Sequence, residues 1–325
     1  MSPRSLAKLL ALAVAAAWGA SFVAIKRVTD ELSAGAAGAA DVVVPFYLAR
    51  FAMTSACFLP VLVLGRRELA RYGARDWAWA VLVGIIVAPA YHLPLFFAAR
   101  ALPSALLAVI IATSPVITAV LARLFLAERV GVRRAAGVLV SFAGVATAVM
   151  VQHRMSQGGP ALGASGRGWF LYPALVGASA LAAALWSVCG RAALREKNPT
   201  VFVAAATVTA TALTSFLWSG RALERILSLS AWGWAGVGYL AVVATFLAYI
   251  GWYWSLKRLD ASEVTVFLNV TPLVALALGA LIRSEAMSSL YLAGAAMVVA
   301  GVYITQRSPS AGTARAGGSP GEEAA

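Results

Sequence analysis

Residues 113–128 read TSPVITAVLARLFLAE, and residues 270–285 read VTPLVALALGALIRSE. Each stretch has a proline at its third position and a glutamate thirteen residues later, and a constant offset of 157 residues separates the two. The same offset aligns Gly137 with Gly294 and a second pair of glycines seven residues further on. Proline, glutamate and glycine have specific backbone or charge roles, so their coincidence on one offset predicts an internal duplication.

The composition indicates that lipid is the solvent of this chain. The 325 residues are 61% hydrophobic and 12% charged, whereas a soluble domain is about 45–50% apolar and about 25% charged. A bilayer core about 30 Å thick requires about 20 apolar residues per helix. We therefore predict an all-α integral membrane protein with ten transmembrane helices. The ten segments are residues 6–25, 42–64, 77–98, 102–122, 135–151, 169–190, 199–218, 232–254, 261–282 and 289–306.

The first segment also resembles the start of a secretory signal, because Arg4 and Lys8 precede an apolar run. That run continues to Lys26, over about 20 residues, whereas the apolar core of a signal peptide has about 7–15. We therefore expect a retained helix.

The basic residues predict the orientation. If the N-terminus is cytoplasmic, sixteen Lys and Arg residues fall in cytoplasmic segments and eight in external segments, a bias that favours both termini inside. We expect a multi-pass protein of the inner or plasma membrane. The excess of basic residues behind the net charge of +13 then lies along the cytoplasmic face of the membrane. We therefore expect no nucleic-acid partner.

Each half of the chain holds five predicted helices, and an odd number makes the second copy enter the membrane in the reverse direction. The first repeat covers residues 6–151 and the second covers residues 169–306. Residues 152–168 form an external linker rich in Gly and Ser, and residues 307–325 form a disordered cytoplasmic tail. Inverted repeats support alternating access around a midplane site in many transporters.

This pattern resembles the drug/metabolite transporter superfamily, specifically its EamA-type branch. The resemblance covers roughly residues 8–305 and rests on the two five-helix copies, WGxxF at residues 18–22, Arg50–Phe51, and Thr245 before an aromatic stretch. It implies a secondary transporter that exports or exchanges small metabolites such as amino acids or purines, with no cofactor and no metal. Multidrug and nucleotide-sugar-like carriers are the alternatives.

Helix-breaking residues in the third and eighth segments predict a binding cavity. Pro89 and Pro94 each remove an internal hydrogen bond, and the offset aligns Pro94 with Gly251 and His92 with Tyr249. The alternative is a belt of interfacial aromatic residues. The other aromatic candidates for solute binding are Tyr91, Trp252, Tyr253 and, from the first and sixth segments, Trp18 and Trp186.

Polar residues near the repeated prolines are further candidates. Pro115 and Pro272 are expected to interrupt the fourth and ninth segments, where nearby hydroxyls satisfy local backbone groups. Asn269 is expected to face a helix or the cavity, because an amide against lipid is costly.

Glu128 and Glu285 lie near the predicted membrane boundaries, where they are expected to cap a helix or pair with a basic residue. Gly137 and Gly294 either allow close helix approach or mark the face of a homodimer.

Arg50 is a charge deep in a predicted helix, and its aligned position, 207, is threonine. Charges at such depth are by default functional, and snorkelling to the headgroups is the alternative. Proton coupling has two candidates. Glu263 is the carboxylate that could carry a proton, but it lies near the opposite surface. His92 has an ordinary pKa of about 6.5.

Other classes of function fit less well. The chain has two histidines and no HExxH or GxSxG run, so an integral membrane enzyme is disfavoured. A channel remains a further alternative, but inverted repeats with broken helices favour a carrier. Exporters of lipophilic cations often use a glutamate within the membrane to bind the cation, and the first segment has none. The aromatic residues instead suit neutral or zwitterionic metabolites.

Overall fold

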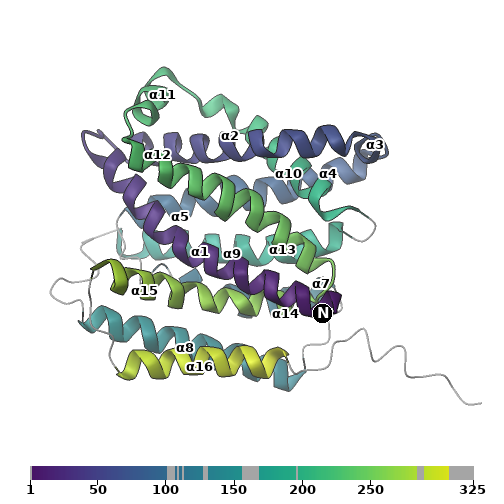
Figure 1. Ribbon diagram of the computed structural model, residues 1–325, viewed down its shortest axis with the longest axis vertical. Coiled ribbons are helices and arrows are strands. Elements are labelled where there is room, and N and C mark those ends of the chain that lie inside the picture. Colours follow the sequence, from purple (N-terminus) through teal and green to yellow (C-terminus); the bar gives the residue numbers. More distant parts are fainter. Residues whose placement is uncertain are drawn as a thin grey trace, which may run out of the picture.

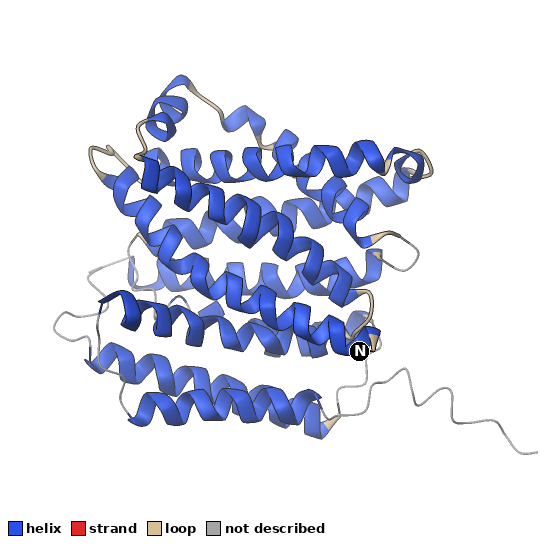
Figure 2. Cartoon of the chain, viewed as in Figure 1, coloured by secondary structure: helices blue, strands red, loops and turns tan. Residues whose placement is uncertain are grey.

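The computed structural model describes residues 2–100, 107, 110–111, 113–126, 131–155, 168–194, 197–283 and 289–306. Every regular element within these ranges is a helix (Figures 1 and 2). The first half holds α1 (Pro3–Ser33), α2 (Ala40–Leu64), α3 (Arg66–Leu69), α4 (Ala74–Ile85), η1 (Ile86–Ala90), α5 (Tyr91–Ala99), α7 (Ser114–Phe125) and α8 (Val132–Met155). The second half holds α9 (Gly168–Ala193), α10 (Pro199–Leu213), η2 (Ser215–Leu217), α11 (Gly220–Leu227), α12 (Ala231–Gly238), η3 (Tyr239–Leu247), α13 (Ala248–Leu256), α14 (Ala261–Thr265), η4 (Val266–Asn269), α15 (Val270–Arg283) and α16 (Ser289–Gln306).

Six helical stretches in the described residues are long and apolar enough to cross a membrane. They are Pro3–Ser33, Ala40–Leu64, Ala74–Ala99, Leu171–Ala193, Pro199–Leu217 and Ala231–Leu256. The other four predicted segments overlap shorter apolar helices, Ser114–Phe125, Ala135–Gly144, Ala261–Ala275 and Leu292–Thr305. The protein is therefore an all-helical, multi-pass membrane protein.

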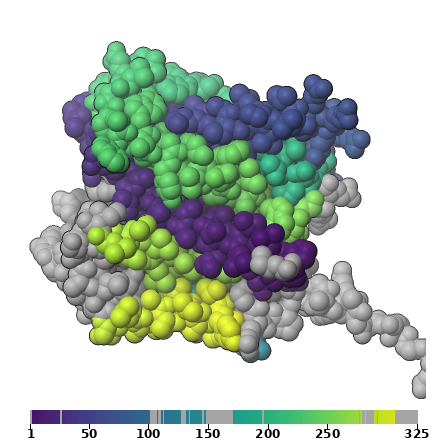
Figure 3. Space-filling view, viewed as in Figure 1, coloured from purple at the N-terminus to yellow at the C-terminus, as the bar shows by residue number. Residues whose placement is uncertain are grey.

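Helix α1 packs against the second half of the chain. Figures 1 and 3 show it flanked by α12 and α13 on one side and by α15 on the other. Side chains of the second half bond to its carbonyl groups: Tyr239 Oη donates to Ala17 at 2.8 Å, and Ser255 Oγ donates to Ala7 at 2.9 Å. A Cβ on Gly251 would lie only 3.1 Å from Val14 Cγ2. Helix α13 therefore runs antiparallel to α1.

Glycines allow α8 and α16 to lie side by side at one edge of the molecule (Figure 1). A Cβ on Gly137 would lie 2.7 Å from the carbonyl oxygen of Gly301, and a Cβ on Gly144 would lie 2.6 Å from that of Gly294. These glycines are buried between two helices of the same chain. Their contacts are those expected for close helix approach within the chain, and the homodimer face stays a prediction.

Helices α8 and α16 also meet at residues that the 157-residue offset aligns. Ser141 Oγ donates to the carbonyl of Val298 at 3.2 Å, and the two residues are 157 apart. The glycine contacts lie on either side of this bond and run in opposite directions along the two helices. Contacts between a residue and its own equivalent are what a two-fold axis between the helices produces.

The third and eighth predicted segments contain π-helical turns instead of breaks. Segment η1 ends at Ala90 and η3 ends at Leu247, again 157 residues apart. The helix continues through Pro94 in α5 and Gly251 in α13, so the predicted breaks at these two residues are wrong. A π turn widens the helix and relieves the lost proline hydrogen bond without stopping it, while Gly251 serves the close approach to α1.

The repeated prolines lie at the beginnings of helices. Pro115 is in the first turn of α7, where its missing N–H would have had no helical partner. Pro272 is in the first turn of α15, directly after the 3₁₀ segment η4, so the ninth segment is irregular as expected. The predicted roles of Glu128 and Glu285 concern residues outside the described ranges.

The glycine contacts lead to a stability prediction. Gly144→Ala should lower the free energy of unfolding by about 1–3 kcal/mol, because its methyl group meets backbone atoms that cannot move aside. The matched control is Gly177→Ala in α9, where an added Cβ has open space within 4 Å and should leave stability unchanged or higher. Thermal unfolding in detergent measures both; equal Tm values for Gly144→Ala and the wild type would contradict the close approach.

Candidate functional site

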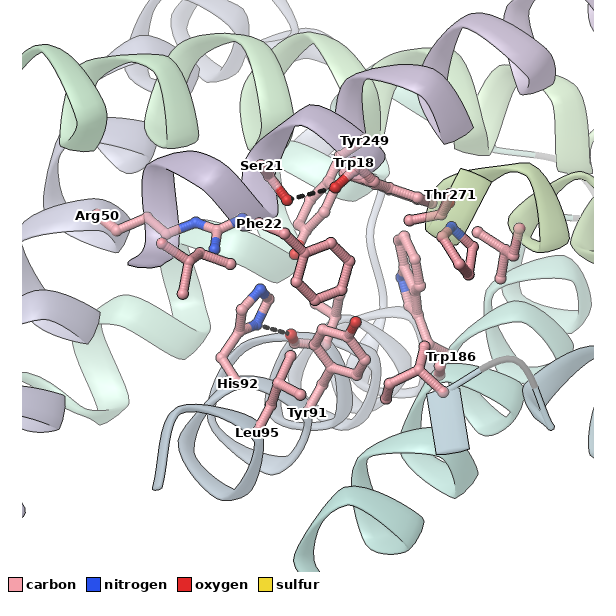
Figure 4. Close-up of a pocket in the computed structure, with 16 residues that line it drawn as sticks. Trp18, Ser21, Phe22, Arg50, Tyr91, His92, Leu95, Trp186, Tyr249 and Thr271 are labelled. Atoms are coloured by element: carbon pink, nitrogen blue, oxygen red, sulfur yellow. Dashed lines mark hydrogen bonds between the residues drawn. The ribbon is translucent and has the colours of Figure 1, made fainter. Parts of the chain in front are cut away.

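A cavity lies between α1, α2, α5, α9, α13 and α15 (Figure 4). It encloses about 80 Å³, counted as the space open to the centres of water-sized spheres. One water requires about 10–15 Å³ on this measure, so the cavity has room for several waters or a small solute. Its walls are Trp18, Ser21, Phe22, Ile25, Arg50, Val87, Tyr91, His92, Leu95 and Ile111 from the first half, and Ala183, Trp186, Tyr249, Leu268, Thr271 and Pro272 from the second.

Equivalent residues of the two halves face the same cavity. Two pairs that the 157-residue offset aligns contribute to the walls, His92 with Tyr249 and Ile111 with Leu268. Trp18 and Trp186, from the first helix of each repeat, also line the cavity, but they are 168 residues apart. Neither half forms the cavity alone.

Arg50 is buried, with 3% of its surface exposed, and it lines the cavity. Its Nε donates to Thr245 Oγ1 at 3.0 Å, and its guanidinium carbon lies 5.9 Å from the centre of the Phe51 ring. No carboxylate among the described residues is within ion-pair distance of it. Snorkelling does not describe this side chain, because its charge stays inside the protein.

The π segment η3 holds Arg50 and Trp18 in place. Its turns release carbonyl groups from the usual helical pattern, and side chains at the cavity bond to them. Trp18 Nε1 donates to Ala244 O at 2.7 Å, and Thr245 Oγ1 donates to Leu240 O at 2.6 Å. The Thr245 hydroxyl thus gives its proton to the backbone and presents a lone pair to Arg50.

The π segment η1 orients His92 in a similar way. His92 Nδ1 lies 2.8 Å from the carbonyl oxygen of Val87 and 3.2 Å from that of Ala88. A carbonyl only accepts, so Nδ1 carries the proton and Nε2 is left for other partners. Val87 and Ala244 are 157 residues apart, so the ring N–H groups of His92 and Trp18 bond to carbonyls that the repeat aligns.

Trp252 and Tyr253 lie behind the cavity and are not part of its walls. Both are fully buried. The Trp252 ring lies 5.0 Å from that of Trp18 and stacks 5.8 Å from that of Trp186, while Tyr253 Oη accepts a hydrogen bond from Trp186 Nε1 at 2.6 Å. The two residues follow Tyr249 by about one helical turn, so they back the wall that Tyr249 faces.

Asn269 is also buried without lining the cavity. Neither its amide nitrogen nor its amide oxygen has a hydrogen-bond partner in the described part of the protein. Its neighbour Leu268 lines the cavity instead.

Ion pairs join the beginning of α1 to the second half of the chain. Glu263, on α14, is 2% exposed and lies 3.1 Å from both Arg4 and Lys8. Arg191, at the end of α9, pairs with Asp260 at 3.2 Å. Glu263 is therefore paired with residues at the beginning of α1, whereas Trp18 and the cavity lie further along that helix.

The sequence analysis did not identify most of the uncharged residues that line the cavity. Ser21 and Phe22 follow Trp18 by three and four residues, and this helical spacing was the available signal. The hydroxyl groups near the repeated prolines were expected to bond to local backbone groups. One of them, that of Thr271, donates to Ala15 O on α1 at 3.1 Å, and Thr271 also lines the cavity. Leu95 carries no signal in so apolar a chain.

A bundle of apolar helices around a buried polar and aromatic cavity is the architecture of a membrane transport protein. The chain belongs to the EamA-like transporter family, whose sequence pattern matches residues 5–150 and again residues 172–307. The resemblance to this family seen in the sequence is thereby confirmed.

Individual relatives agree with this membership. An uncharacterized transporter from Archaeoglobus fulgidus is 28% identical over 294 residues, which cover 89% of this chain and 95% of that protein. A probable amino-acid metabolite efflux pump from Salmonella typhimurium is 39% identical over 66 residues, 20% of this chain and 22% of that protein. A protein of known crystal structure shares the fold, with a TM-score of 0.68 and 19% identity over 92% of this chain and 96% of that one.

Proposed function

We propose that this transporter is a secondary carrier that exports or exchanges small metabolites, such as amino acids or purines, by alternating access around the cavity. The observation that carries the proposal is that both halves of the chain build the walls, with two residue pairs at the 157-residue offset and a tryptophan from the first helix of each repeat. A site at the interface of two repeats opens to one side or the other when the repeats rock against each other.

The proposed architecture is ten transmembrane helices in two inverted repeats, residues 6–151 and 169–306, with both termini cytoplasmic. The Ser141–Val298 contact supports a two-fold axis between the repeats, and the π segments that end 157 residues apart support equivalent third and eighth helices. The excess of basic residues on the N-terminal side supports the orientation.

The geometry favours a carrier over a channel. Behind the Trp18–Trp186 wall, Trp252 and Tyr253 are fully buried and pack against it, and Glu263 forms ion pairs with the beginning of α1. A carrier is closed on at least one side at any time, whereas an open channel needs a continuous path.

Enzyme and drug-carrier functions have less support. The described walls hold no carboxylate and no nucleophile with a base, because Ser21 Oγ donates to the Trp18 carbonyl of its own helix. A carrier for lipophilic cations would place them beside Arg50, and a nucleotide-sugar carrier would want more than this one cation.

Transport in reconstituted vesicles tests the carrier function. Proteoliposomes preloaded with unlabelled solute should accumulate the same labelled solute transiently, and the initial rate should saturate, because a carrier exchanges one bound solute for another. The panel comprises amino acids, purines and organic acids, and empty liposomes are the control. Flux that rises linearly with concentration and shows no counterflow would identify a channel.

Proton coupling through His92 is the second prediction for this function. His92 shares the cavity with Arg50, Tyr91 and Tyr249, so a proton on Nε2 would add positive charge beside Arg50. The transport rate should vary with pH, and His92→Gln should flatten this profile. His153→Gln, which replaces the other histidine, should leave it intact; an unchanged profile in His92→Gln would remove this residue from coupling.

A further inference from the structure

We propose that Arg50 binds the carboxylate of the transported solute, and that the solute class is a monocarboxylate with a small, flat apolar body and no required amino group. This inference rests on the proposed transport function and names the solute class for the same cavity.

Among the described residues, the charge of Arg50 has no partner of opposite sign. It is buried within a membrane protein, and no carboxylate in the described residues pairs with it. Leaving such a charge uncompensated costs several kcal/mol. An anion in the adjoining cavity would supply the compensating charge.

The guanidinium of Arg50 is also oriented for a carboxylate. Its Nε is occupied by Thr245, while neither terminal nitrogen donates to a described protein oxygen. A carboxylate has two oxygens at the spacing of the guanidinium fork, so it can accept two parallel hydrogen bonds. The bond to Thr245 fixes the plane of this fork before the solute arrives.

Thr245 is therefore a positioning residue. Its hydroxyl proton is held by Leu240 O in the π segment, so its lone pair points to Arg50 and to no other donor. Holding the guanidinium in one orientation reduces the entropy lost on binding. Through Thr245, the π segment η3 therefore increases the affinity of Arg50 for the solute.

The remainder of the cavity suits a flat apolar group. Figure 4 shows Arg50 and His92 at one side of the cavity and Trp186 and Thr271 at the other, with Phe22 between them. The Trp18 and Trp186 rings lie 5.7 Å apart, and the Trp186 and Tyr249 rings lie 5.1 Å apart. An aromatic ring would pack against this wall while its carboxylate reaches Arg50.

The walls offer an amino group no partner of opposite charge. The described lining residues include Arg50 and His92 but no Asp or Glu, so an ammonium group would gain no ion pair and would be repelled by Arg50. A dianion such as a phosphate ester carries two negative charges, and Arg50 would balance only one of them. A single negative charge is the best match.

The test uses four compounds with the same phenyl body: 3-phenylpropionate, phenylalanine, 3-phenylpropionamide and 2-phenylethylamine. Binding to the full-length protein in detergent is measured by quenching of tryptophan fluorescence and by the shift in Tm. The carboxylate should bind at least 10-fold more tightly than the amide and the amine, and more tightly than phenylalanine, because Arg50 repels the ammonium group and the described walls offer it no carboxylate. Equal binding of the amide or amine, or no binding of the carboxylate, would overturn the inference.

Variants separate the roles of the two residues. Arg50→Gln should abolish the preference for the carboxylate, and Arg50→Lys should weaken binding about 10-fold, because a point charge loses the fork. Thr245→Val should raise the half-saturation concentration for counterflow with little change in maximal rate, and Thr245→Ser should restore it. The control Thr207→Val removes a buried hydroxyl that has no described partner and lies outside the cavity; if it changes affinity as much as Thr245→Val does, the positioning role is wrong.

The same compounds distinguish failure of the inference from failure of the proposed function. Counterflow of other solutes, with no binding of 3-phenylpropionate, leaves a carrier standing and overturns the solute class. Arg50-dependent binding of 3-phenylpropionate without any counterflow supports the site and contradicts the carrier function.

Discussion

Carbonyl groups released by the two π-helical segments must find donors within the protein, because a bilayer offers none. The side chains that donate to carbonyls of η3 are Trp18, Thr54 and Thr245, and His92 donates to carbonyls of η1. Trp18 and His92 line the cavity, and Thr245 bonds to Arg50, which also lines it. The requirement to satisfy the backbone therefore also fixes the side chains on which the proposed binding depends.

The two halves are held together by contacts at two levels. At one edge, glycines bring α8 and α16 together around the Ser141–Val298 bond. Near the cavity, α1 lies among helices of the second half, and ion pairs of Glu263 hold its beginning against α14. The two halves are thus joined both at the edge of the molecule and beside the cavity.

The sequence predicted the helical class, the family and part of the cavity, because charged, polar and aromatic residues are conspicuous in an apolar chain. Six predicted binding residues do line it: Trp18, Arg50, Tyr91, His92, Trp186 and Tyr249. The breaks at Pro94 and Gly251 were wrong because a π turn leaves no compositional signal. Trp252 and Tyr253 back the cavity wall instead of forming it, because rotation about a uniformly apolar helix cannot be determined from periodicity. Asn269 is buried within the protein, away from the cavity walls.

Access to Ser21 from each side of the membrane tests the central claim most directly. Ser21 lines the cavity, and Ser21→Cys nearly preserves its size, in a background where the free Cys57 and Cys189 are replaced by serine. A membrane-impermeant thiol reagent is added to right-side-out vesicles and, separately, to inside-out vesicles. Alternating access predicts modification in both preparations, slowed by a saturating solute; modification from one side only, or from neither, would contradict it.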